Sequence, residues 1–407
     1  MENQNIKDLQ KRLVDEIIKK GFIKTKEVEE AFLAVPRHLF LPGVDLEKVY
    51  SDIPIVTKWN GEIPVSSSSQ PSAMTIMLEQ LELKSGLKIL EIGAGTGLNA
   101  ALMAQITGKN GKVVTVDIDK DIAGLAEENL NSAGCNHVKV ICQDGASGYE
   151  PEAPYDRIIL TAGVWDINRE WFNQLKPGGI LLVPMVISIK DQMTIAFKRA
   201  GDHLESTSIS GCKFMELQGN YPKPVNCVEI GHTISLCSKY ALDLNKENLS
   251  INFKKNWKDF PSNVKTTNKE IYQSLLPWLE IFEPKFCIIA SNIETTEILN
   301  LPVLPNYKGR SASLLYGLAD KKSICLLNFI EEETKADDLN LKSYTLHIRN
   351  FGSDEKLAQH MVEKLIKWDK AGRPDINNVN VKAYFDNIVP SKDEHLIIKK
   401  WVNLLFS

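Results

Sequence analysis

The sequence predicts an α/β protein, with a doubly wound and mostly parallel sheet followed by a second domain of mixed α+β character. Three observations lead to this prediction. An apolar strand pattern at Lys88 to Ile92 runs into a glycine-rich turn, and a helical pattern follows. Strand and helix patterns then alternate as far as Pro184, which is typical of a parallel sheet. A chain of 407 residues is also longer than one ordinary domain.

The order of the expected elements follows from hydrophobic periodicity and from turn residues. Two helices, at residues 7–20 and 25–35, precede an irregular stretch rich in Pro, Gly and Ser that ends at Ser69. A further helix is expected from Ala73 to Leu83. The strands of the sheet are expected at residues 88–92, 112–117, 138–142, 155–160 and 180–184, and the helices between them at 98–106, 122–130 and 168–175.

A change of composition marks the end of the first domain. Gln218 to Pro224 contains two prolines and a glycine, which is typical of a linker. We therefore expect a first domain at residues 1–218 and a second domain at residues 219–407. The clearest helix of the second domain is Asp354 to Lys370, where apolar residues recur at i, i+4 and i+8. The apolar run at residues 395–405 fits either a strand or a helix.

Composition excludes several classes of function. The net charge of −4 and the pI near 6.1 disfavour extended nucleic-acid binding. No run approaches the roughly 18 apolar residues of a membrane helix, and the polar N-terminus lacks the apolar core of a signal peptide. We therefore expect no membrane partner and a cytoplasmic location. The seven cysteines are scattered without a C-x-x-C pair, and histidines and cysteines do not cluster, so reduced thiols and no metal site are expected.

The glycine-rich turn indicates which ligand the sheet binds. Dinucleotide sites carry G-x-G-x-x-G, and the third glycine of that pattern would stand where this chain has Leu98. The chain instead reads E-x-G-x-G-x-G, the pattern of S-adenosylmethionine-dependent methyltransferases with a Rossmann-like fold. The expected cofactor-binding residues of this turn are Glu91, Gly93, Ala94, Gly95, Thr96 and Gly97.

Two further acids end strands of the predicted sheet. Asp117 closes the strand after the glycine turn, where a carboxylate would accept the two ribose hydroxyls. Asp144 and Gly145 follow the next strand, at a place suited to the adenine amino group. Each acid alone is more often an ordinary turn residue, but this order favours contacts with S-adenosylmethionine.

A polar segment before the first strand suits an anion. The run Ser66 to Ser69, with Gln70 and Pro71, leads into a helix and offers hydroxyls and backbone N–H groups. Such groups at a helix N-terminus can hold a carboxylate. The alternative interpretation is a flexible loop in which one serine caps the helix.

These blocks in this order resemble the protein-L-isoaspartate O-methyltransferase family. The resemblance covers residues 5–217 and includes Val35 to Phe40, Tyr50 to Pro54 and Ser67 to Pro71. It implies that Ser69 is the active-site serine that holds the substrate carboxylate, beside the substrate-contacting residues Ser67, Ser68 and Gln70. The implied substrate is a peptide or protein that bears aspartate or isoaspartate. Leu98-Asn99 replaces the frequent Tyr-Gln after the turn, so that part of the pocket is expected to differ.

The second domain resembles the extension of methyltransferases that modify ribosomal peptides, namely the lanthipeptide-associated and FxLD branches. Residues 357–369, Gly372 to Pro374 and residues 396–401 carry this resemblance. It implies an accessory, substrate-recognition domain and methylation of an aspartate in a modified precursor peptide, whose methyl ester cyclises to a succinimide. The alternative is general isoaspartyl protein repair. A third interpretation, a binding module with an inactive sheet domain, is opposed by the intact turn at Glu91 to Gly97. The sequence identifies neither the peptide nor the oligomeric state.

Overall fold

The structure is a computed structural model in which the chain forms two compact units. It describes residues 2–187, 189, 192–219, 226–230, 233–239, 242–253, 257–302, 312–332, 342–352, 354–391 and 394–407. The first unit comprises Met1–Val186, Gln192–Pro222 and Asn380–Ser407, and the second comprises Ile187–Asp191 and Lys223–Val379. The chain therefore passes between the two units four times.

The first unit begins with helices and continues as alternating strands and helices. Its helices are α1 (Glu2–Lys19), α2 (Lys26–Ala34), η1 (Arg37–Phe40), α3 (Leu46–Val49), α4 (Pro71–Gln80), α5 (Leu98–Thr107), α6 (Lys120–Ser132), η2 (Gly145–Ser147), η3 (Glu150–Glu152) and α7 (Arg169–Asn173). Its strands are β1 (Ile55–Asn60), β2 (Ile63–Ser68), β3 (Lys88–Ile92), β4 (Lys112–Asp117), β5 (Lys139–Cys142), β6 (Tyr155–Leu160), β7 (Leu175–Val186), β8 (Gln192–Ala200), β9 (His203–Cys212), β17 (Val381–Tyr384), β18 (His395–Ile398) and β19 (Asn403–Phe406).

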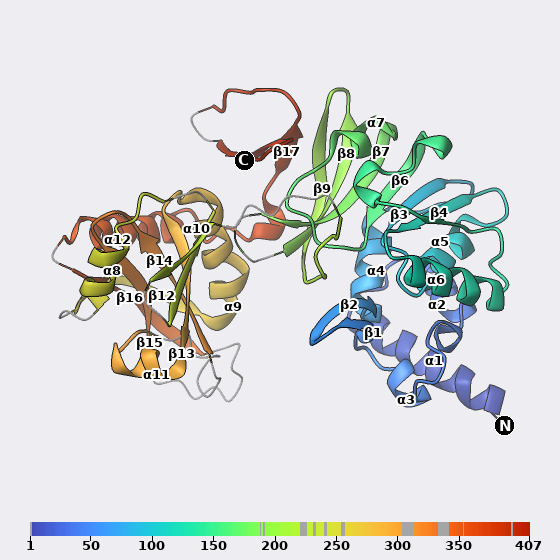
Figure 1. The fold of residues 1–407 in the computed structure, drawn as a ribbon, viewed down its shortest axis with the longest axis horizontal. Coiled ribbons are helices and arrows are strands. Elements are labelled where there is room, and N and C mark those ends of the chain that lie inside the picture. The colour runs from blue at the N-terminus through green and yellow to red at the C-terminus, as the bar shows by residue number, and fades with distance from the viewer. Residues whose placement is uncertain are drawn as a thin grey trace. The chain divides into compact units, whose positions relative to one another are not determined.

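Ten of these strands form one sheet in the order β18-β19-β17-β9-β8-β7-β6-β3-β4-β5, while β1 and β2 form a separate hairpin. The strands from β7 to β5 run parallel, and those from β8 to β18 are antiparallel. Strand β3 lies between β4 and β6 (Figure 1), so the order reverses at its carboxyl end, where ligands bind in such sheets. The predicted fold class is confirmed.

One apolar core joins this sheet to the helices around it. Alternate strand residues point into the core, among them Ile89 of β3, Val113 of β4 and Ile159 of β6. Helix α5 adds Leu98 and Leu102, and helices α1, α2 and α4 complete the same cluster. Each large side chain that is fully buried contributes about 1.5–3 kcal/mol. This packing fixes the carboxyl ends of β3 and β4, where the predicted site lies.

The C-terminal residues correct the expected domain boundary. The prediction extends the second domain to residue 407, but residues 380–407 belong to the first unit. Strand β17 pairs with β9, with Ala383 opposite Leu204, and the run at residues 395–405 forms two strands and a turn rather than a helix. The sequence does not reveal this pairing because the two partners are far apart along the chain.

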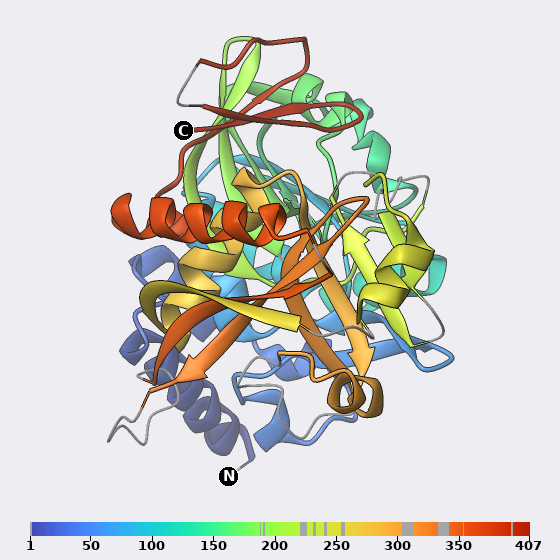
Figure 2. The same ribbon diagram turned by 90° about the vertical axis from the view of Figure 1, so that its left-hand side faces the viewer.

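The second unit is a seven-stranded antiparallel sheet with helices on both faces (Figures 1 and 2). Neighbouring residues Ile288 and Ile289 point to opposite faces, one into a core with α10 and α12 and the other into a core with α8. The predicted helix at 354–370 is confirmed as α12. The elements are β10 (Asn226–Ile230), β11 (Ile234–Ser238), α8 (Lys246–Phe253), β12 (Trp257–Thr267), α9 (Asn268–Glu270), η4 (Ile271–Leu275), α10 (Leu276–Phe282), β13 (Phe286–Asn292), α11 (Ile293–Ile298), β14 (Ala312–Ala319), β15 (Ile324–Glu331), β16 (Ser343–Phe351), α12 (Lys356–Lys370) and η7 (Ile376–Asn378).

Two cysteines differ from the expectation of reduced thiols. Cys227 and Cys237 stand directly opposite each other on β10 and β11 and form a disulfide. Their spacing carries no local motif, and the hairpin alone brings them together. Most of the expected linker, residues 220–224, lies outside the described residues. Over the described ranges, no helix is long and apolar enough to span a membrane, and no three His, Cys, Asp or Glu side chains gather as metal ligands.

The return of the C-terminal strands to the first sheet can be tested with Phe406→Ala. Phe406 on β19 is 0% exposed, and truncation of a buried Phe costs about 3–5 kcal/mol. We expect faster amide hydrogen exchange in β17 and β9, with β10 to β16 unchanged. Ile398→Ala, at a residue that is 67% exposed, is the control and should leave exchange unaltered. Faster exchange in β10 to β16 instead would contradict the assignment.

Candidate active site

The turn after β3 approaches its neighbours so closely that side chains would not fit. Gly93, Gly95 and Gly97 have positive φ angles of 105°, 53° and 87°, which glycine adopts without strain. A Cβ atom on Gly93 would lie 2.3 Å from the Thr161 hydroxyl oxygen, and one on Gly97 would lie 3.0 Å from the Ala126 carbonyl oxygen. The predicted turn is thus a cradle of backbone atoms that packs directly against Thr161 and helix α6.

Asp117 lies beside this cradle because β3 and β4 are parallel and end at the same edge. Its Oδ2 atom accepts the Gly95 N–H at 3.3 Å, and its Oδ1 atom accepts the Asp119 N–H at 3.1 Å. Burial raises the pKa of the Asp117 carboxyl above its ordinary value. Each carboxylate oxygen can accept more than one hydrogen bond, so Asp117 retains capacity for the two ribose hydroxyls.

Asp144 and Gly145 lie at the end of the next parallel strand. The Asp144 carboxylate accepts the Ala146 N–H at 2.9 Å and caps the short helix η2. Gly145 lines the cavity described below, whereas the described lining does not include Asp144. A Cβ atom on Gly219 would lie 2.8 Å from the Asp144 carboxylate, so the chain after β9 runs directly over this acid.

Glu91 is the fully buried acid of the site. Its two carboxylate oxygens accept hydrogen bonds from the Thr115 hydroxyl at 2.7 Å and from the Asn99 amide at 2.8 Å. Burial raises the pKa of Glu91 from 4.5 to about 7, although both hydrogen bonds oppose this shift. Glu91 therefore ties the start of α5 to β4. The sequence marks Asn99 only as a departure from the family pattern.

The serine segment (Ser66 to Ser69) forms the end of β2 and the residue after it, and it is held by a buried cation. The Arg37 guanidinium donates to the carbonyl oxygens of Val49, Ser51, Ile53 and Ser69. Burial lowers the pKa of Arg37 to about 10. A Cβ atom on Gly95 would lie 3.5 Å from the Ser67 carbonyl oxygen, so this segment passes close above the glycine turn. Arg37 thus has a structural role.

The helix after the serine segment does not offer the anion site that the sequence suggests. Helix α4 begins at Pro71, which has no N–H group. The Ser72 N–H is already accepted by the Asp52 carboxylate at 2.9 Å, and the Gln70 amide donates to the Asp52 carbonyl oxygen at 3.1 Å. The protein's own acid therefore takes the place of a substrate carboxylate at this helix. Hydroxyl groups remain as the anion-binding groups of the segment.

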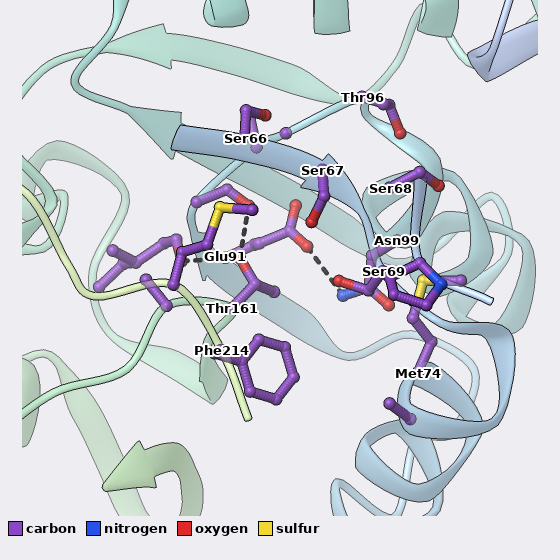
Figure 3. A pocket seen from close by; sticks show the side chains of 18 of the residues that line it. Ser66, Ser67, Ser68, Ser69, Met74, Glu91, Thr96, Asn99, Thr161 and Phe214 are labelled. Carbon is purple, nitrogen blue, oxygen red and sulfur yellow. Dashed lines mark hydrogen bonds between the residues drawn. The ribbon is translucent and has the colours of Figure 1, made fainter. Parts of the chain in front are cut away.

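One cavity of about 650 Å³ joins the glycine cradle to the serine segment. Figure 3 shows Ser67, Ser69, Glu91, Asn99 and Phe214 around it. Ser67, Ser68, Ser69 and Gln70 all line the cavity, although the Ser68 side chain is almost fully buried. The described lining contains three carboxylates (Asp117, Asp119, Glu216), the buried Glu91 with its raised pKa, and one ammonium group (Lys213). This charge and the open cradle fit S-adenosylmethionine, which carries a sulfonium and an ammonium group.

The wall formed by residues 211–218 is a part of the site that the sequence does not predict. Phe214 lines the cavity from this segment, and both its backbone N–H and its carbonyl oxygen are bound by the Gln192 side chain. Thr161, at the end of β6, donates its hydroxyl to the Gly93 carbonyl oxygen at 2.7 Å. No sequence signal marks Gln192, because it is an ordinary polar residue at the start of a strand.

Comparison with known proteins gives one consistent result. The family described as Protein-L-isoaspartate(D-aspartate) O-methyltransferase matches residues 8–221. The protein-L-isoaspartate O-methyltransferase of Methanopyrus kandleri is 37% identical over 209 residues, which are 51% of this chain and 90% of the relative. That of Hyperthermus butylicus is 35% identical over 223 residues, 53% of this chain and 90% of the relative.

A solved structure extends the likeness of fold to the second unit. It is named protein-L-isoaspartate O-methyltransferase, and the alignment covers 92% of this chain and 96% of that chain with a TM-score of 0.51. The sequence identity is 24%, so the similarity concerns the fold alone. Since so much of this chain is covered, the second unit is part of the shared fold.

The role of Asp117 can be tested by Asp117→Ala. Hydrogen bonds to a charged group contribute about 1.5–3 kcal/mol, so we expect the dissociation constant of S-adenosylhomocysteine to rise about 10- to 100-fold. Isothermal titration calorimetry measures this constant directly. The control is Asp121→Ala, which removes a carboxylate that is 85% exposed and should bind normally. An unchanged constant for Asp117→Ala would refute the ribose assignment.

The buried Glu91 should make stability depend on pH. The folded protein holds its proton up to about pH 7, whereas the unfolded chain releases it near pH 4.5. The free energy of unfolding therefore falls as the pH rises through this window, by about 3 kcal/mol in total. Glu91→Gln removes this cost, because the amide oxygen can accept one of the two hydrogen bonds while the amide NH2 donates to the other partner, either Thr115 or Asn99.

Urea denaturation of the cofactor-free protein at pH 5 and pH 8 measures the effect. We expect Glu91→Gln to exceed the parent in stability at pH 8 and to match it closely at pH 5. Glu127→Gln, at an exposed position on α6, should change neither value. A loss of stability at pH 8 would show that the ionised Glu91 is stabilising.

Proposed function

Because the chain belongs to the protein-L-isoaspartate(D-aspartate) O-methyltransferase family, we propose that its cavity brings S-adenosylmethionine and an isoaspartyl carboxylate together for methyl transfer. The chain is an S-adenosylmethionine-dependent carboxyl O-methyltransferase of this family. One observation carries the finer proposal. A single cavity is lined by both the glycine cradle and the serine segment, so the methyl donor and the acceptor can meet in it.

The proposed division of roles follows from the charges. Gly93, Gly95 and Asp117 hold the cofactor, and the hydroxyl groups of Ser69 and Ser67 orient the substrate carboxylate. S-adenosylmethionine supplies a methyl group on a sulfonium, and an O–C bond forms as the S–C bond breaks, leaving a neutral ester and S-adenosylhomocysteine. An aspartyl carboxyl group has an ordinary pKa of about 3.9 and is ionised at neutral pH. No general base is needed, and positioning supplies the acceleration.

The substrate is best assigned as an isoaspartyl residue in a polypeptide. The methyl ester formed on such a residue is attacked by the neighbouring backbone nitrogen, which releases methanol and leaves a succinimide. This outcome needs no further group from the protein. The family match and the relatives named for isoaspartate support this assignment.

The second candidate substrate is an aspartate of a modified ribosomal precursor peptide. This hypothesis depends on the resemblance of the second domain to lanthipeptide-associated methyltransferases. A structure named protein-L-isoaspartate O-methyltransferase has a similar fold across 92% of this chain. The presence of a second unit therefore does not by itself favour a specialised peptide, and a recognition role for residues 223–379 stays a proposal.

The decisive experiment offers two acceptors to the enzyme with labelled S-adenosylmethionine. One is a linear isoaspartyl peptide, and the other is the modified precursor peptide encoded nearest the gene. We expect label on the isoaspartyl peptide, followed by loss of methanol in mass spectra. Label on the precursor alone would replace this proposal with peptide tailoring.

Ser69→Ala should lower turnover about 10- to 100-fold, as for loss of one positioning hydrogen bond, while the affinity for S-adenosylhomocysteine stays within threefold.

Ser132→Ala is the matched control for Ser69→Ala. Its hydroxyl bonds only locally, to the Glu128 carbonyl oxygen on the exposed face of α6, so turnover should remain at the parent value. Equal loss of turnover and of cofactor affinity in Ser69→Ala would argue against a role in substrate positioning.

A further inference from the structure

The side chain of Gln192 binds the backbone of Phe214 at both of its polar groups. The Gln192 Nε2 atom donates to the Phe214 carbonyl oxygen at 3.0 Å, and the Phe214 N–H donates to the Gln192 Oε1 atom at 2.6 Å. One amide thus satisfies the donor and the acceptor of one residue, as a neighbouring strand would. Gln192 itself is fixed as the first residue of β8.

The same segment is held on its other side by Gly163. The Gly163 N–H donates to the Met215 carbonyl oxygen at 2.7 Å, and the Leu217 N–H donates to the Gly163 carbonyl oxygen at 2.8 Å. A Cβ atom on Gly163 would lie 2.6 Å from the Gln192 Nε2 atom. Gln192 therefore passes tightly over a glycine to reach Phe214, so the segment has little freedom to shift.

The ring that this segment carries forms part of the cavity wall. Figure 3 shows the Phe214 ring in the same pocket as Ser67, Ser69, Glu91 and Thr161, which all line the cavity. Phe214 and Met215 both line the cavity, and β9 ends just before them at Cys212. The backbone hydrogen bonds fix the position of the Phe214 Cα atom, and with it the point from which the ring reaches into the cavity wall.

An apolar wall has a specific value for this reaction. The carboxylate and the sulfonium neutralise each other as the methyl group moves, so charge is lost on the way to the transition state. Water stabilises separated charges more than neutralised ones, and electrostatic attraction is stronger where water is excluded. A ring that keeps water from the reacting atoms therefore lowers the barrier, whereas it adds little to cofactor binding at the glycine cradle.

We propose that Gln192 is a positioning residue for methyl transfer, which clamps Phe214 so that its ring excludes water from the reacting carboxylate and sulfonium. The catalytic benefit rests on the proposed function, but the clamp itself rests on the two hydrogen bonds. Gln192 does not touch the substrate in this account. It acts through the backbone of Phe214.

The test compares the variant Gln192→Glu with the same substitution at a second glutamine, which serves as the control. Glutamate has the same shape and still accepts the Phe214 N–H, but it cannot donate to the Phe214 carbonyl oxygen and sets a negative charge against it. The control is Gln80→Glu. The Gln80 amide donates to the Thr194 carbonyl oxygen of the same strand at 3.3 Å and to Ser208, and Gln80 is not among the described residues that line the cavity.

Three measurements separate the clamp from a general structural role. We expect amide hydrogen exchange in residues 213–217 to become about 10-fold faster in Gln192→Glu, as for loss of one to two hydrogen bonds. Turnover of the isoaspartyl peptide should fall about 5- to 50-fold, and the dissociation constant of S-adenosylhomocysteine should stay within threefold. Gln80→Glu should leave all three values at those of the parent.

A second variant keeps the proposal testable if Gln192→Glu is unstable. Phe214→Ser leaves the backbone clamp intact and removes the apolar ring, so turnover should fall while exchange in residues 213–217 stays slow. Faster exchange with unchanged turnover would overturn the proposal, as would a loss of cofactor affinity equal to the loss of turnover. If neither peptide accepts a methyl group, the proposed function fails, whereas the exchange and affinity measurements still decide whether the clamp exists.

Discussion

The close approach of the Gly93 backbone to Thr161 is the constraint on which the site depends. No side chain fits at Gly93, because a Cβ atom would collide with the Thr161 hydroxyl, and that hydroxyl donates to the carbonyl oxygens of Ile92 and Gly93. This contact joins the ends of β3 and β6. The turn can then present the Gly95 N–H to Asp117 at the end of β4. The backbone of the glycine turn therefore forms one side of the site. Its position is fixed by the ends of β3, β4 and β6 and not by a loop.

The groups above the glycine turn are held by two charged side chains that bind other parts of the protein. Arg37 uses its guanidinium to bind carbonyl oxygens, including that of Ser69, and Asp52 caps the N–H of Ser72. Both charged groups bind backbone groups of the protein and not a ligand. The serine hydroxyls are therefore the groups of this segment that can bind a ligand in the cavity. The cavity thus has acidic side chains beside the glycine turn and neutral hydroxyl groups on the serine segment. That division matches a cationic donor and an anionic acceptor.

The sequence predicts that the glycine turn and Asp117 lie together, but it does not predict the side-chain contacts that fix the rest of the cavity. The reasons are physical. Gly93 to Gly97 and Asp117 could be placed because consecutive parallel strands end at one edge of the sheet, so a local pattern fixes a three-dimensional neighbourhood. The clamp of Gln192 on Phe214 and the capping of Ser72 by Asp52 are side-chain contacts across some twenty residues (|i−j| of 22 and 20), and no periodicity encodes them. The pairing of β17 with β9 depends on an even more distant partner.

The way in which the chain alternates between the two units limits how the second unit can be lost from the gene. The chain leaves the first unit after Pro222 and returns at Asn380, and a short excursion at Ile187–Asp191 interrupts the β7–β8 connection. Ile189 of that excursion is buried in the core of the second unit. The second unit is therefore an insertion and not an appendage, since the last strands of the catalytic sheet are encoded after it. A single new stop codon cannot remove it without also stripping β17 to β19. Its loss requires two matched breakpoints, so truncating the gene at one end cannot leave a complete first unit by itself.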